Sequence, residues 1–188
     1  MIHNVLLGLA KELNVFLRNR LNLQEDVVVL SELMNLDGTV AVNTENRIIC
    51  SLLSIEEERT SLNAPLNLGN TISNRPLNLN LYLLFSAFYA PSNYLEALKA
   101  LSFTLLFFQG KQVFTPANTP SLDANINRLV IDLVNVDLKD LSNFWTALGA
   151  KHLPSAFYRV RMLSMTADVI LAETDDIRTL DTGTATTE

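Results

Sequence analysis

The chain has 188 residues, of which 48% are hydrophobic, 18% are charged and one is a cysteine, and its formal net charge is −6. This length suits one globular domain and leaves no room for a second full one. A lone cysteine excludes a disulfide framework and a cysteine metal cluster, two histidines exclude a multi-histidine metal site, and no apolar run reaches the roughly 18 residues of a membrane-spanning helix.

The negative charge is concentrated at one end. Residues 173–188 carry a net charge of −4, which leaves −2 for residues 1–172. Without a basic stripe we predict no nucleic-acid binding. The 35 leucines and the mean hydropathy of +0.21 indicate more apolar surface than one monomer hides, so we expect an oligomer. The first residues resemble no signal peptide, so we expect synthesis in the cytoplasm.

The first third of the chain predicts one helix and two strands. Residues 2–20 place apolar side chains at spacings of three and four, which predicts an amphipathic helix. Residues 27–30 are a β-branched run that predicts a buried strand, and Asp37 with Gly38 predicts a turn. Residues 47–57 are apolar on both alternating faces, which predicts an internal strand that holds Cys50 as a buried, inert thiol.

A loop and the clearest strand follow. Residues 59–75 are rich in asparagine and show no periodicity, so we predict a loop that is either mobile or used for contact. Pro76 opens a strand over residues 77–86 in which leucines alternate with polar side chains. One face of this strand is therefore predicted to be core.

The middle of the chain predicts a helix over residues 93–110. Asn93 and Glu96 have the spacing of a capping box, and Gly110 is the predicted C-cap. Its apolar stripe predicts a buried helix and consists of Leu95, Leu98, Leu101, Leu105 and Phe108.

Two strands, a short helix and a last strand complete the predicted domain. Residues 113–114 and 128–136 predict strands. Asp137 predicts the N-cap of a helix that ends at Gly149. The inward residues of that helix are Leu141, Phe144, Trp145 and Leu148. Residues 157–170 predict the last long strand.

The order of these elements predicts an α+β single domain with a mixed, mostly antiparallel sheet of about six strands flanked by helices. We assign residues 1–172 to this domain. Residues 173–188 have too little apolar content to fold alone and predict a flexible acidic arm.

Candidate catalytic residues are few. Ser155, His152 and Asp168 can be assembled into a triad, but no glycines of a nucleophile elbow surround the serine, which favours ordinary loop and strand residues near Pro154. Residues 56–58 are three glutamates that could bind a metal or act as acid and base. Because successive strand residues point to opposite faces, a solvated strand end is the favoured interpretation.

Binding motifs are also absent from the sequence. Gly69, Gly110 and Gly149 are isolated, so no phosphate-binding loop is predicted. Phe144 and Trp145 are an aromatic pair whose helical spacing favours core over a ligand platform. The sequence thus predicts no catalytic, cofactor-binding or metal-binding residue and no cofactor.

Three segments resemble one known family. The phrase FWTALGAKHLPSAFYRVRMLSM, residues 144–165, resembles the signature of the tail-terminator or cap proteins of contractile injection systems, the phage-tail-like particles of bacteria. The strand PLNLNLYLLFSAFY, residues 76–89, resembles the family's middle segment, and SLLSIEEER, residues 51–59, matches a third place. The residues that carry the first match are Trp145, Leu148, Gly149, Pro154, Ser155, Tyr158, Val160 and Arg161.

The resemblance covers about residues 1–170. It implies a tail-terminator-like fold and a ring, typically of six copies, that sits on the distal end of the inner tube and sheath and stops their polymerisation. It also implies a structural protein without enzymatic activity or membrane insertion, carried in an assembled particle that can leave the cell. The expected ring interfaces are residues 59–75, the sheet edges and the termini.

Two other classes of function stay open at this point. An assembly adaptor or chaperone would bind another particle component through the surplus of apolar surface, with the acidic arm steering it towards basic partners. A small hydrolase would use a site around His152 and Ser155.

Overall fold

The computed structural model describes residues 2–35, 37–39, 41, 45–58, 71–73, 77–123, 126–165 and 170–173, without the side chains of 71–73, 162–165 and 170–173. The helices in this part of the chain are α1 (Ile2–Leu21), α2 (Tyr94–Gly110) and α3 (Leu138–Leu148), with a 3-10 turn, η2 (Pro91–Asn93), before α2. The strands are β1 (Val28–Leu30), β2 (Arg47–Glu57), β3 (Thr71–Ser73), β4 (Leu77–Phe88), β5 (Val113–Phe114), β6 (Leu129–Val134), β7 (Ser155–Met165) and β8 (Ile170–Glu173).

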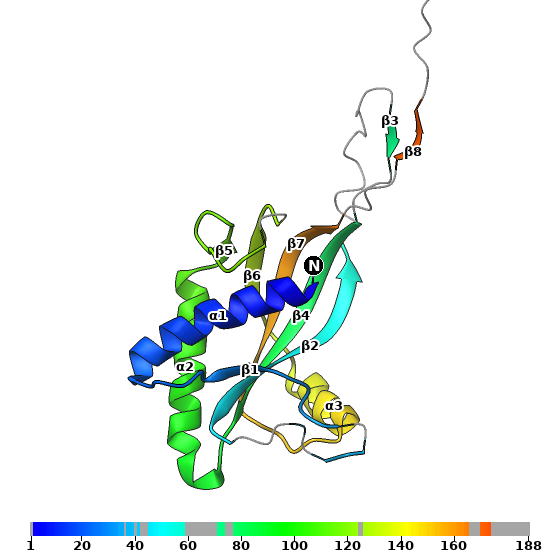
Figure 1. Ribbon diagram of the computed structural model, residues 1–188. Helices are drawn as coiled ribbons and strands as arrows, with labels where there is room; N and C mark the ends of the chain where they lie inside the picture. Colours follow the sequence, from blue (N-terminus) through cyan, green and yellow to red (C-terminus); the bar gives the residue numbers. More distant parts are fainter. Residues whose placement is uncertain are drawn as a thin grey trace, which may run out of the picture.

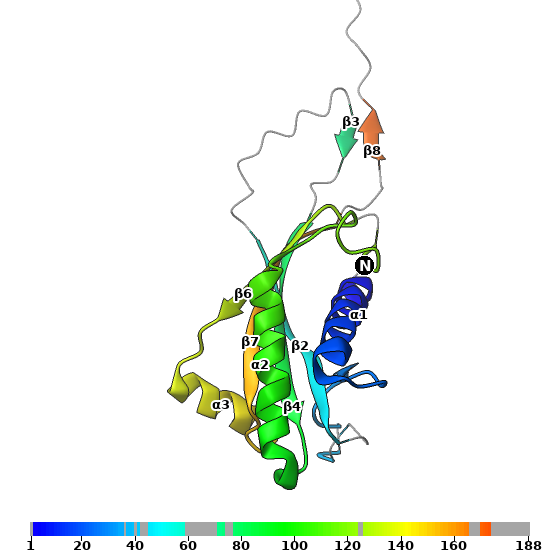
Figure 2. The ribbon, with the colours of Figure 1, turned by 90° about the vertical axis from the view of Figure 1, so that its left-hand side faces the viewer.

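Six of these strands form one sheet in the order β1-β2-β4-β7-β6-β5. Only β1 and β2 are parallel, and the other neighbours are antiparallel. Helices α1 and α2 cover one face of the sheet and α3 packs on the other (Figures 1 and 2). The predicted α+β domain with a mixed, mostly antiparallel six-stranded sheet is confirmed.

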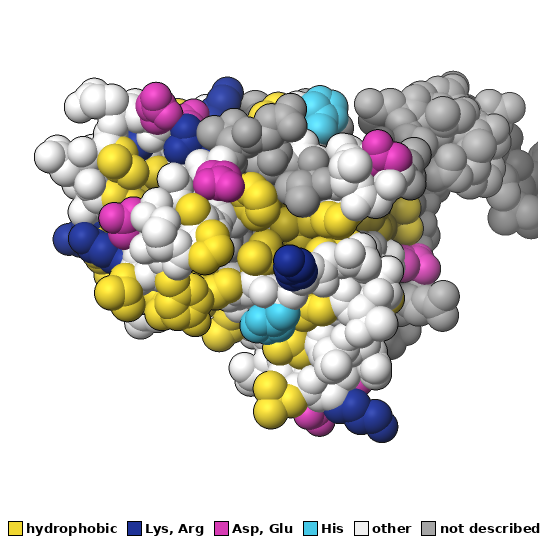
Figure 3. Space-filling model, turned by 90° about the horizontal axis from the view of Figure 1, so that it is seen from below, with side chains coloured by type: hydrophobic (Ala, Val, Ile, Leu, Met, Phe, Trp, Pro, Cys, Tyr) yellow, Lys and Arg dark blue, Asp and Glu magenta, His cyan; other side chains and the backbone are white. Residues whose placement is uncertain are grey.

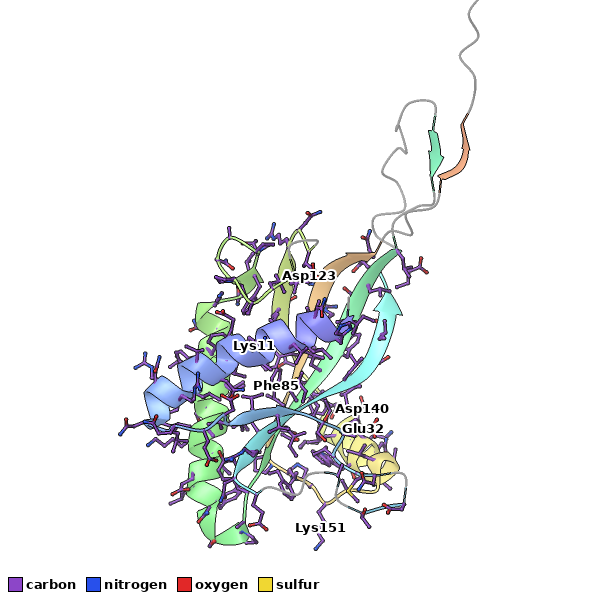
Figure 4. All side chains as sticks on the ribbon, viewed as in Figure 1. Lys11, Glu32, Phe85, Asp123, Asp140 and Lys151 are labelled. Carbon is purple, nitrogen blue, oxygen red and sulfur yellow. The ribbon has the colours of Figure 1, made fainter. Side chains whose placement is uncertain are left out.

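The larger core lies between the sheet and helices α1 and α2. Phe85 of β4 is at its centre (Figure 4) and packs against Phe108 of α2, with 5.2 Å between ring centroids. Tyr158 of β7 contacts both rings, at centroid distances of 5.6 and 4.8 Å. This aromatic cluster joins the two central strands to α2.

A buried asparagine fastens α1 to the sheet. The side-chain amide of Asn14 donates a hydrogen bond to the Val28 carbonyl oxygen, 3.0 Å away. Its Oδ1 accepts hydrogen bonds from the backbone N–H groups of Val27 and Val28, at 2.8 and 2.7 Å. Asn14 therefore satisfies three backbone groups at the start of β1, which would otherwise be buried without partners.

Strand β4 is buried on both faces, although its sequence predicts one core face. Leu83 and Phe85 point into the larger core. Leu84 on the opposite face joins a second, smaller core with Ile49 of β2 and Trp145 of α3. The second face was missed because Leu84 is followed by Ser86, a polar residue that is nevertheless fully buried.

Helix α2 buries two residues of the predicted stripe, Leu101 and Phe108, but not the other three. Leu95, Leu98 and Leu105 are exposed, whereas the buried side is lined by Ala97, Ala100, Leu101, Thr104, Phe107 and Phe108. The two alanines let the helix backbone approach the sheet closely, and the phenylalanines fill the remaining volume. The prediction of a buried helix is therefore confirmed for one side of α2 and wrong for Leu95, Leu98 and Leu105.

Of the predicted caps of α2, Asn93 occupies the N-cap position but without a capping hydrogen bond, and the prediction of Gly110 as C-cap is wrong. Asn93 belongs to the preceding 3-10 turn and makes no side-chain cap; its amide donates instead to Oδ1 of Asn46, at 3.1 Å. Gly110 is the last helical residue, and Lys111, with an extended backbone, is the cap.

Helix α3 has the predicted caps. The Asp137 carboxylate accepts a hydrogen bond from the backbone N–H of Lys139, at 3.5 Å. Gly149 adopts the left-handed conformation, with φ of 67°, in which a glycine is favoured over other residues. Both ends of α3 are therefore specified locally.

The end of the domain differs from the predicted single strand over residues 157–170. Strand β7 begins at Ser155, because the Pro154 carbonyl already accepts a hydrogen bond from the Ala87 N–H, at 2.9 Å. Strand β8 is separate from β7. It pairs antiparallel with β3, which lies inside the segment predicted as a loop. The rest of that predicted loop lies outside the described residues, as does the predicted acidic arm after Glu173.

We predict that Asn14→Ala lowers the free energy of unfolding by about 3 kcal/mol, because it leaves three buried backbone groups without hydrogen bonds. Urea denaturation followed by circular dichroism measures this loss. Asn19→Ala, on the exposed side of the same helix, is the control and should change stability by less than about 0.5 kcal/mol. Equal losses for the two variants would contradict the bridging role.

Candidate functional site

The candidate triad is not assembled in the described part of the chain. His152 is exposed and lies edge-on against the Trp145 ring, with 5.5 Å between centroids. Ser155 is half-buried and pairs with Ser86 across the sheet. No hydrogen bond joins the His152 and Ser155 side chains, and Asp168 lies outside the described residues. The described residues thus give no nucleophile and base in contact.

The glutamates at the end of β2 are used in cross-strand hydrogen bonds. Glu56 accepts a hydrogen bond from the Tyr82 hydroxyl at 2.9 Å, and Glu58 accepts one from the Asn80 amide at 3.0 Å. These two carboxylates share the face that Glu57 does not, as the strand periodicity predicts. No group of three or more His, Cys, Asp or Glu residues that could hold a metal ion occurs among the described residues.

The sequence analysis missed a charged cluster on β6 and β7. Asp132 Oδ2 lies 2.6 Å from Arg161 Nε and 4.0 Å from an Arg159 guanidinium nitrogen. All three side chains are about one-third exposed, so each pair contributes no more than about 1 kcal/mol. The signal in the sequence was two arginines at a spacing of two, on a strand whose neighbour carries an aspartate.

The predicted core position of Trp145 is confirmed, since its side chain is 4% exposed. The ring packs edge-on against Phe144, with 5.6 Å between centroids. Among the described residues, none accepts a hydrogen bond from its indole N–H. The Trp145 side chain lines a hollow of about 350 Å³, which is also lined by Leu138, Leu141, Thr146 and His152.

A second hollow, also of about 350 Å³, lies at the lower end of the domain. We call it the lower hollow; its lining includes Leu33, Met34, Phe88, Ala150, Lys151 and Leu153. Figure 3 shows hydrophobic side chains on this underside with one basic side chain near its middle, and Figure 4 shows Lys151 extending from the lower end of the domain. An apolar hollow with a cation at its rim provides binding contacts but no acid and base pair.

A third concave surface lies on one flank, where α2 and α3 stand on either side of β6 (Figure 2). We call it the flank groove; it measures about 320 Å³, and its lining includes Leu105, Leu133, Val134, Val136, Leu141 and Phe157. Most of its side chains are apolar, and Asn135 and Ser155 are the polar residues that line it. The described surfaces therefore suit association with other chains better than chemistry on a small molecule.

The described helices and the lone thiol add no further chemistry. None of these helices combines the length and the apolar content needed to cross a membrane. Cys50 is buried in β2, and burial raises the pKa of its thiol to about 12. The predicted inert thiol is confirmed, because the thiolate is the reactive form.

Comparison with known proteins gives one family and two solved structures. The family described as the Pvc16 N-terminal domain matches residues 5–179. The PVC sheath/tube terminator of an extracellular contractile injection system, in its extended state, is similar over 100% of this chain and 64% of its own, with a TM-score of 0.68 and 17% identity. The anti-feeding prophage cap, a tube-terminating cap, is similar over 93% of this chain and 59% of its own, with a TM-score of 0.54 and 16% identity.

These matches define what is shared. At such identities the two structures share the fold with this chain, which spans about three-fifths of their length. No curated protein sequence matches the chain.

We predict that Trp145→Ala lowers the free energy of unfolding by about 3 to 5 kcal/mol, because it removes the largest side chain of the smaller core. His152→Ala, which alters the exposed ring beside it, should change stability by less than about 0.5 kcal/mol. Thermal or urea unfolding measures both. A loss below about 1 kcal/mol for Trp145→Ala would show that the tryptophan is not a core residue.

Proposed function

The chain belongs to the Pvc16 N-terminal domain family, and from this membership we propose that it is a terminator of a contractile injection system. It covers the distal end of the inner tube and sheath and stops their polymerisation. The observation that carries the proposal is the likeness, along the whole chain, to a sheath/tube terminator. Tube and sheath proteins are therefore its proposed partners, and the assembled particle is its proposed location.

Length control explains why such a protein needs surfaces rather than an active site. A tube that grows by stacking rings exposes at its end the surface that recruits the next ring. A terminator must match that surface on one side and differ from it on the other. The domain has different layers on its two sides, α1 and α2 on one face of the sheet and α3 on the other, and this asymmetry supports the proposal.

We propose that the terminator is a homohexameric ring. A ring forms when each subunit binds the next through two different surfaces and the rotation closes. The exposed leucines support association, because Leu95 is 79% exposed and Leu138 is 81% exposed. The proposed ring needs no catalytic residue, which agrees with the separated His152 and Ser155 side chains.

We predict that deletion of this protein in a cell that builds the particles gives tubes and sheaths of irregular length or prematurely contracted particles. Baseplates should still form, because termination acts at the other end. Electron microscopy of purified particles measures the length distribution and the fraction extended.

Complementation separates this function from the alternatives. The wild-type chain and the His152→Ala variant should both restore one uniform length, whereas a hydrolase that depends on His152 would be restored only by the wild type. If particles without the chain keep a uniform length and stay extended, the terminator function is wrong and an assembly adaptor becomes the better account.

A further inference from the structure

The flank groove continues into a wider apolar surface. On α2, Leu98 precedes Leu105 by two helical turns and lies on the same side; each is 36% exposed. On β6, Leu133 is 53% exposed. On α3, Leu141 lines the flank groove and also, together with Leu138, the hollow at Trp145. Figure 2 shows the three elements on this flank.

The side chains of this surface are large, apolar and partly in contact with water, from 36% exposed at Leu98 to 81% at Leu138. The largest apolar patch on a monomer is often a functional surface. Apolar side chains of this kind suit the centre of a protein–protein interface.

An open strand edge borders the groove. Strand β5 pairs only with Leu129 and Val130 at the start of β6, and the Ile131 N–H donates to the Gln112 carbonyl at 2.9 Å. Alternate residues of a strand direct their backbone groups to the same edge, so Leu133 directs its N–H and C=O outwards. No strand of the described chain lies on that side of Leu133.

The opposite end of the sheet has a matching edge. Strand β1 pairs only with Ile48 to Cys50, and no strand among the described residues pairs with the outer edge of β2 at Leu52 and Ile55. Leu52 and Ile55 are 38% and 45% exposed. The sheet order places this edge and the flank groove at opposite ends of the domain.

We propose that the flank groove binds the outer edge of β2, around Leu52 and Ile55, of a second copy of this chain. The contact joins two unlike surfaces at opposite ends of the subunit, so it is head-to-tail. A pair of subunits still has one unoccupied flank groove and one unoccupied β2 edge, to which further copies can bind. Backbone groups of Leu133 gain partners and the leucines on both sides lose contact with water. This contact rests on the proposed ring and identifies the surfaces that form it.

Charge placed in the groove tests the contact. Leu133→Glu should keep the circular dichroism spectrum and unfolding midpoint of the wild type, and should weaken self-association by at least about tenfold, with the 20.9 kDa monomer dominating in analytical ultracentrifugation. Leu7→Glu is the matched control, because Leu7 is 45% exposed on α1. Undiminished assembly of Leu133→Glu would overturn the proposal.

Engineered cysteines test which surfaces meet, and they do so even if Leu133→Glu disturbs the fold. Because Cys50 is buried, any disulfide between subunits comes from the added cysteines. The doubly substituted chain, Ile55→Cys with Leu133→Cys, should form a ladder of disulfide-linked multimers on mild oxidation. Each single variant should form none. Dimers from Leu133→Cys alone would indicate a symmetric contact and overturn the head-to-tail assignment.

The outcomes also separate this inference from the terminator function. A purified chain that stays monomeric, or a ring whose cysteines at positions 55 and 133 never join, contradicts this interface. Uniform, extended particles formed without the chain contradict the terminator function. Irregular particles together with an unaffected Leu133→Glu ring would retain the function and reject the interface.

Discussion

Strand β4 pairs with β2 on one side and β7 on the other, and its side chains are buried on both faces near Leu83 and Leu84, so the domain needs a packed layer on each side of the sheet. Helices α1 and α2 provide one layer, and Asn14 holds α1 in place through the backbone of β1. Helix α3 provides the other through Trp145. Apolar side chains remain exposed on the described strands and on the outer sides of the described helices, and these side chains are available for association.

Local signals in the sequence predicted the elements whose ends are fixed by their own residues. Helix α3 is the clearest case, since Asp137 and Gly149 cap it without help from distant segments. The predicted buried stripe of helix α2 was partly wrong because the number of leucines does not decide which face meets the sheet. Ala97 and Ala100 lie on the buried face, where small side chains allow close approach. Strands β3 and β8 are far apart in the sequence, so no local sequence pattern predicts that they pair. For the site, the sequence predicted no catalytic residue, and it did not predict the cluster of Asp132 and Arg161, because that cluster depends on the register between two strands.

In this domain the polar side chains mainly hold the elements of the chain together, and apolar side chains form the surfaces available for binding. The polar side chains that make directed contacts, such as Asn14 and the Glu56 partner Tyr82, join the elements of one chain to each other. The apolar side chains that remain at the surface, such as Leu133 and Leu138, are more than half exposed. In the proposed contact, binding between chains depends on shape and on backbone pairing at the edges, which places few constraints on side-chain identity. This freedom is consistent with a shared fold at 17% identity.

The position of β7 has a consequence for synthesis of the protein. It lies at the centre of the six-stranded sheet, between β4 and β6, yet it is the last of these six strands to leave the ribosome. Until Ser155–Met165 emerge, the nascent chain holds β4 with one free edge and β6 without its main partner. Contacts between distant segments make such folding slow and expose edges that can join other chains. The interval between translation and completion of the sheet is therefore when this protein most needs protection from aggregation.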